Sequence, residues 1–199
     1  GAISSSLQIL EREAKFSPIM IDRKLFEEFI RNQKVGWEEK ASALVMGLLR
    51  FKLYARNDPI YMSIADKVET LLEKWRRKIK TSIELYEEAK RLWKEIYGLK
   101  EEQKKLHFEH REFLIYRTLI NKGFKQEHAI EVTRKLIGKI KNKINVPGWK
   151  HNPKLAHDVE RIVALTLLRE ARKAKLPANE TKKLIDLVIE GIKSVEEKH

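Results

Sequence analysis

Two histidines in this 199-residue chain have the spacing of metal ligands on a helix. His107 and His110 lie three residues apart, with Glu109 between them and Glu112 close behind. Side chains three residues apart share a helix face, and imidazole and carboxylate groups are zinc ligands. Two ligands do not complete a site, however, and no further ligand is apparent from the sequence. We therefore predict ordinary surface histidines here and no metal site.

The sequence lacks the motifs of common catalytic sites. Its eight glycines are isolated and none precedes Lys-Ser or Lys-Thr, so there is no phosphate-binding loop. It has no nucleophile elbow, and the absence of cysteine excludes thiol nucleophiles, disulfides and thiolate metal sites. Carboxylates alternate with lysines, as at Glu84, Glu87 and Lys90, which is typical of a solvated helix face. We expect no catalytic residue and no cofactor in this chain.

Two clusters of basic residues are candidates for DNA contact. The first contains Arg76, Arg77, Lys78 and Lys80, and the second contains Lys135, Lys139, Lys141 and Lys143. One interpretation is contact with phosphates; the other is solubility, with favourable placement of cations at a helix C-terminus. The formal net charge of +13 is spread along the chain, which favours weak, sequence-independent binding to DNA over a dedicated reading surface.

Apolar residues recur at steps of three and four, which predicts helices throughout. The longest such stretch runs from Pro59 to about residue 97, a rod of roughly 58 Å at ~1.5 Å per residue, with Asp58 as its N-cap. Its stripe includes Trp75, Ile79, Ile83 and Trp93. A second apolar row beside this stripe, available to neighbouring helices or to a partner protein, consists of Ile60, Leu85, Leu92 and Leu99.

Other helix boundaries are marked by capping residues, proline and glycine. Helices are predicted from Asp22 to about residue 32, from Trp37 through Phe51, from Leu106 to Ile120, from about Lys125 to Ile144, from Pro153, and after Leu176-Pro177. Ser17-Pro18 and Asn152-Pro153 mark helix starts, Gly98 is placed at the end of the long helix, and Val146-Pro147-Gly148-Trp149 is typical of a type II turn. The four tryptophans are interpreted mainly as core residues.

The predicted fold is therefore all-α, a bundle of about seven helices with one long central helix. We divide it into a helical lead-in, residues 1–36, and a helical domain, residues 37–199. The start at Gly1-Ala2 indicates a segment of a longer protein. With no long apolar run, a soluble, cytoplasmic protein without membrane contact is expected. Abundant lysine and glutamate favour a thermophilic source.

Part of the sequence resembles the C-terminal helical region of type I restriction endonuclease motor subunits, known as R subunits. The resemblance is carried by Ala43-Leu44, by Asn57-Asp58-Pro59-Ile60-Tyr61 with the helix that follows, and by Arg111 to Tyr116. It continues through Ile137 to Trp149, Arg161 to Leu168 and Leu176-Pro177. It extends from about Trp37 to Ile192.

The resemblance implies a non-catalytic module that docks the motor onto the methyltransferase and specificity subunits. The nuclease and translocase domains, with their ATP and magnesium, would belong to the parent subunit only. No interface residue is transferred, because the matching motif is structural. The alternative is a free-standing basic helical protein that binds nucleic acid.

Overall fold

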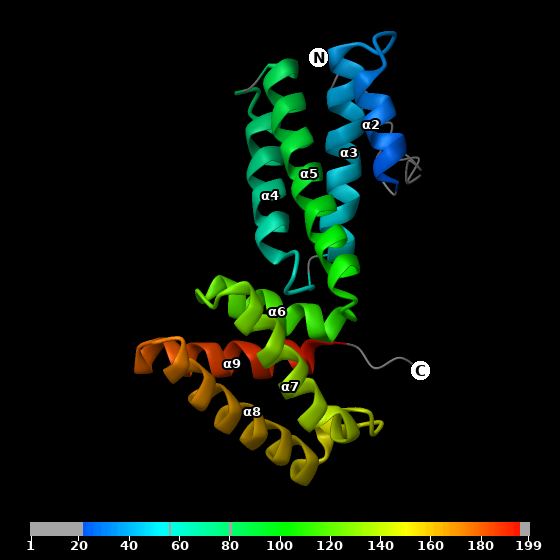
Figure 1. The fold of residues 1–199 in the computed structure, drawn as a ribbon. Helices are drawn as coiled ribbons and strands as arrows, with labels where there is room; N and C mark the ends of the chain where they lie inside the picture. Colours follow the sequence, from blue (N-terminus) through cyan, green and yellow to red (C-terminus); the bar gives the residue numbers. More distant parts are fainter. Residues whose placement is uncertain (1–21, 56, 80, 196–199) are drawn as a thin grey trace. The chain divides into compact units, whose positions relative to one another are not determined.

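The computed structural model describes residues 22–55, 57–79 and 81–195, which form eight α-helices and no β-strand (Figure 1). The predicted all-α class is confirmed. Ser17-Pro18 lies outside the described residues. The described residues form two compact units, which divide between residues 104 and 105, and the predicted division at residue 36 stays a prediction. None of the helices in the described ranges is long and apolar enough to cross a membrane.

The first unit is organised around Trp93. It contains α2 (Arg23–Arg31), α3 (Trp37–Ala55), α4 (Met62–Arg76) and most of α5 (Ser82–Leu106). The buried indole of Trp93 donates from Nε1 to the carbonyl of Leu44 on α3 at 3.0 Å. Its ring also lies near Phe26 of α2 and Phe51 of α3. Helix α2 therefore contributes Phe26 to this core.

The single helix predicted from Pro59 to residue 97 is wrong, because the chain turns between α4 and α5. Lys78 has a left-handed backbone conformation, with φ of 55°. The N–H of Lys78 donates to Trp75, and the N–H of Ile79 donates to Lys74, both at 3.0 Å. These two bonds form a Schellman motif, which closes the C-terminus of α4. Ile79 and Ile83 consequently lie exposed instead of on a buried stripe.

The start of α4 and the end of α5 also differ from the predicted start at Pro59 and end near residue 97. Asp58 accepts from the N–H of Ile60 at 3.0 Å, but in a turn, and α4 begins only at Met62. Gly98 does not end α5, which continues to Leu106 because glycine is tolerated inside a helix at a cost of ~1 kcal/mol. The helix ends where His107 adopts a φ of 56°.

The second apolar row does not form an exposed surface. Ile60, Leu85 and Leu92 are buried, and Leu99 is half-buried. Of the tryptophans, Trp93 and Trp149 are core residues as predicted, Trp75 is half-buried, and Trp37 is 49% exposed. The second apolar row is therefore largely covered by neighbouring helices.

The second unit is a closed set of four helices. It contains α6 (His110–Asn121), α7 (Gln126–Ile144), α8 (Pro153–Lys173) and α9 (Ala178–Ser194), with a 3-10 turn, η2 (Trp149–His151), before α8. Helix α6 packs on α7 and α9, and α8 packs on the same two helices (Figure 1).

Glycine and asparagine set several boundaries in this unit, as the sequence predicted. Gly123 and Gly148 have positive φ, and the N–H of Trp149 bonds to the carbonyl of Val146 at 3.1 Å, which matches a type II turn. The side chain of Asn152 accepts from the N–H groups of Lys154 and Leu155 and caps α8. These contacts fix where α8 starts.

Candidate functional site

The first basic cluster lies at the end of α4, not along the middle of a helix. Arg76 is the last residue of α4, and Arg77 and Lys78 follow in the turn; all three are exposed. Arg77 forms an ion pair with Glu73 at 3.0 Å. Lys80 lies outside the described residues. Contact between this cluster and DNA stays a prediction.

The second basic cluster lies on α7 and is largely engaged with α8. Lys143 pairs with Asp158 at 3.6 Å, and Lys139 donates to the hydroxyl of Thr166 at 3.4 Å. Lys135 pairs with Glu170 at 3.1 Å. Lysines 135, 139 and 143 are four residues apart, so they form one row along α7. Lys141 is off this row and exposed. Two of the four lysines are thus neutralised within the protein.

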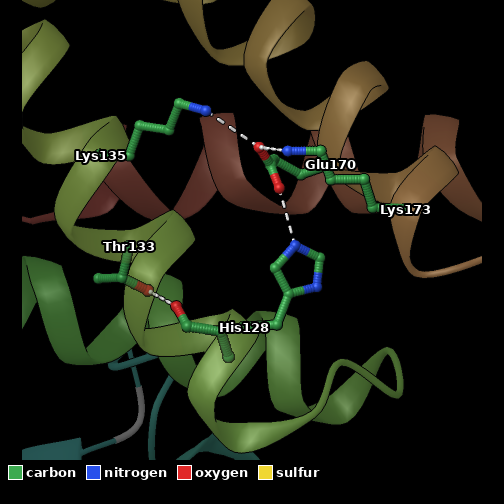
Figure 2. Close-up of polar contacts among 6 residues, drawn as sticks. His128, Thr133, Lys135, Glu170 and Lys173 are labelled. Carbon is green, nitrogen blue, oxygen red and sulfur yellow. Dashed lines mark hydrogen bonds and ion pairs between the residues drawn. The ribbon is translucent and has the colours of Figure 1, made fainter.

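At the contact between α7 and α8, Glu170 has three hydrogen-bonding partners. Its side chain is 1% exposed; Oε2 accepts from Nε2 of His128 at 2.7 Å, and Oε1 accepts from Lys135 and Lys173 (Figure 2). Burial disfavours the ionised carboxylate, but hydrogen bonds from His128, Lys135 and Lys173 outweigh it and lower the pKa of Glu170 to about 2. Glu170 is therefore ionised at neutral pH.

This buried group links α8 to α7. Figure 2 shows His128 and Lys135 reaching the carboxylate from α7, while Lys173 reaches it from α8 itself. Its hydrogen-bonding capacity is used by partners within the protein, and a depressed pKa disfavours proton donation. This contact could not be predicted from the sequence, because His128 and Glu170 are separated by 42 positions.

The solvent side of α8 has an unusual composition. Its exposed residues recur at steps of three and four, which places them on one face. We define the α8 face as Lys154, His157, Arg161, Leu165, Leu168, Arg169 and Arg172, all of which are exposed. Of the three carboxylates of this fully described helix, Asp158 and Glu160 are half-buried and Glu170 is buried. The apolar periodicity of α8 predicted only its buried stripe, although the spacing of the exposed residues follows the same helical period.

Beside the α8 face there is an open groove of about 360 Å³ between α7 and α8. Its lining consists of Lys139, Ile162, Leu165, Thr166 and Arg169. The groove therefore combines two cations, a hydroxyl and aliphatic walls, without a carboxylate. Leu165 is 59% exposed and the adjacent Leu168 is 45% exposed. Such a surface fits a ligand that carries both negative charge and apolar groups.

A second groove, of about 340 Å³, lies between α4 and α5. Its cations include Lys67, Lys74 and Arg91, but Glu88 and Glu95 also line it. Lys67 pairs with Glu95 at 2.8 Å. Because the opposite charges stand side by side, this groove has no clear preference for an anion.

The predicted surface histidines do not share a helix face. His107 ends α5 in a left-handed conformation, whereas His110 is the first residue of α6. Glu109 and Glu112 instead form a capping box at the start of α6. Within the part of the chain that the structure describes, no group of three or more His, Cys, Asp or Glu side chains is arranged to hold a metal.

No family model, curated protein or solved structure matches this chain. The function is therefore proposed from the geometry above and from the resemblance of individual sequence motifs.

Proposed function

We propose that this chain is a non-catalytic docking module from the motor subunit of a type I restriction endonuclease. The family is supported by the motifs between Trp37 and Ile192 that resemble its C-terminal helical region. An all-helical fold agrees with that region. In this proposal the module attaches the motor to the methyltransferase and specificity subunits, and ATP and magnesium bind in other parts of the parent protein.

The observation that carries the docking role is the α8 face. It exposes Leu165 and Leu168 between arginines on a helix whose other side is packed in the second unit. Exposed apolar side chains within a charged surface favour a protein partner, and arginine is enriched at the centres of protein interfaces. The buried second row of the first unit does not supply this surface.

The chain alone should neither hydrolyse ATP nor cleave DNA. This expectation follows from the missing phosphate-binding loop in the sequence, and an assay with magnesium, ATP and long duplex DNA measures it directly. Turnover that disappears when Glu109 or His110 is replaced would contradict it.

The alternative is a free-standing helical protein that binds nucleic acid. It is favoured by the net charge of +13 and by the exposed Arg76, Arg77 and Lys78. Gene context discriminates between the two. Helicase motifs upstream in the same reading frame, beside methyltransferase genes, support docking; an independent short gene supports the alternative.

The docking proposal is tested by deleting this chain from the motor subunit. The truncated subunit should retain a folded ATPase but should no longer assemble with the methyltransferase complex, so restriction is lost. Assembly and restriction at the level of the intact subunit would overturn the proposal.

A further inference from the structure

Helix α8 separates its charges between two sides. Each of its three carboxylates pairs with a lysine of a neighbouring helix: Asp158 with Lys143, Glu160 with Lys193, and Glu170 with Lys135. In contrast, Arg161, Arg169 and Arg172 form no ion pair with any carboxylate of the described residues and are exposed. The acids of α8 therefore do not offset the positive charge of its outer face.

The nature of this face distinguishes between classes of partner. Leu165 and Leu168 lie among the arginines, where phosphates offer no favourable contact to an aliphatic side chain. A helix that lies on a membrane buries a broad apolar face, but the broad apolar side of α8, including Val159 and Val163, is already buried in the protein. A protein segment with acidic and aliphatic side chains satisfies both features of the α8 face.

We propose that the α8 face binds an acidic amphipathic helix of a partner protein. Its aliphatic side chains would pack on Leu165 and Leu168, and its carboxylates would pair with Arg161, Arg169 and Arg172. Guanidinium groups suit this role because they bind carboxylates through two parallel hydrogen bonds. The identity of the partner as the methyltransferase–specificity complex rests on the proposed function. The acidic and aliphatic character of the bound helix follows from the α8 face alone.

The dimensions agree with a helix as occupant. Arg161 and Arg172 are eleven residues apart on α8, which corresponds to roughly 16 Å and three helical turns. The groove of about 360 Å³ beside Leu165 offers room for an aliphatic side chain, with Ile162 as an apolar wall. Lys139 and Arg169 line the same groove, so a carboxylate next to that side chain finds a cation.

The direct test selects binders for the full 199-residue chain from a display library of random helical peptides. The enriched peptides should carry Asp or Glu together with Leu or Ile at helical spacing. Joint replacement of Arg161, Arg169 and Arg172 with Glu should weaken their binding at least about tenfold. The matched control, Arg76→Glu with Arg77→Glu and Lys78→Glu, changes the net charge equally and should change affinity by less than about twofold.

A second variant tests the apolar contacts without changing the charge. Leu165→Ala with Leu168→Ala should also weaken peptide binding, whereas Leu187→Ala, at an exposed position of α9, should not. Circular dichroism melts verify that each variant is folded. The inference is overturned if no acidic-apolar peptides are enriched, or if the α8 variants bind them like the wild-type chain. It is also overturned if these variants keep their affinity for the peptides and lose affinity only for duplex DNA or only for phosphatidylserine-containing vesicles.

Binding to the methyltransferase–specificity complex of the same operon separates this inference from the proposed function. Weaker binding by the α8 variants than by the α4 control supports both. If the wild-type chain binds acidic peptides through α8 but not this complex, the α8 face stands and the restriction role fails. If the complex binds all variants equally, the docking role stands and the assignment to α8 fails.

Discussion

At Gly191, helix α9 approaches α6 so closely that a methyl group would lie 2.3 Å from Cδ2 of Leu114. Gly191→Ala should therefore lower the free energy of unfolding by about 1–3 kcal/mol, because the buried Leu114 must move. Gly138→Ala is the matched control, since Gly138 on α7 has open space at this position. It should be neutral or stabilise by up to ~1 kcal/mol. Equal urea midpoints for the two variants would contradict the close packing of α6 and α9.

Glu170 predicts a specific dependence of stability on pH. Its pKa is lowered from 4.5 to about 2 in the folded protein, so ionised Glu170 stabilises the fold above pH 4.5 and this contribution is lost as the pH falls toward 2. The shift corresponds to roughly 3 kcal/mol. Urea unfolding should show a difference between wild type and Glu170→Gln that is large at pH 7 and shrinks below pH 4.5. A difference that is constant from pH 7 to pH 2.5 would refute the network in Figure 2.

Residue-level prediction from the sequence succeeded for local features and failed for distant ones. Of the four tryptophans interpreted mainly as core residues, Trp93 and Trp149 are buried, and the Asn152 cap was found from its neighbour Pro153. The Glu170 network was missed because Lys135 and Glu170 are 35 positions apart, and a pairing at that distance leaves no periodic pattern. The inward pairing of the α7 lysines was missed for the same reason.

At the level of helices, the errors share one physical cause. Helix ends formed by glycine, proline or asparagine were predicted, as at Gly123. The ends at Lys78 and His107 involve left-handed residues that are not glycine, so nothing in their residue type marks them. The apolar stripe across residues 77–81 therefore suggested one long helix where the structure has two.

The helix break at Lys78 can be tested by substitution. Lys78→Gly should be neutral or stabilise by up to about 1 kcal/mol, because glycine adopts a positive φ without steric cost. Lys94→Gly, at an exposed position inside α5, should instead destabilise by ~1 kcal/mol. Thermal melts compare the two. If both variants are destabilised alike, residue 78 lies inside a helix, and the break between α4 and α5 is contradicted.

For the whole molecule, the charge of +13 predicts weak DNA binding that is independent of sequence and falls steeply as salt rises. Joint replacement of Arg76, Arg77, Lys78 and Lys80 with Gln should reduce the slope of log affinity against log salt by up to about one per lost phosphate contact. Fluorescence anisotropy with two unrelated duplexes measures both properties. An unchanged slope would place this cluster outside the DNA contact.

The docking role is tested most directly by mixing the chain with the methyltransferase–specificity complex at micromolar concentrations without DNA. Sedimentation velocity should show the chain moving with the complex. The variant in which Arg161, Arg169 and Arg172 are replaced with Glu should instead sediment separately from the complex. If the wild-type chain sediments alone and a motor subunit without it still assembles, the chain is not a docking module, and the alternative of a basic nucleic-acid-binding protein takes its place.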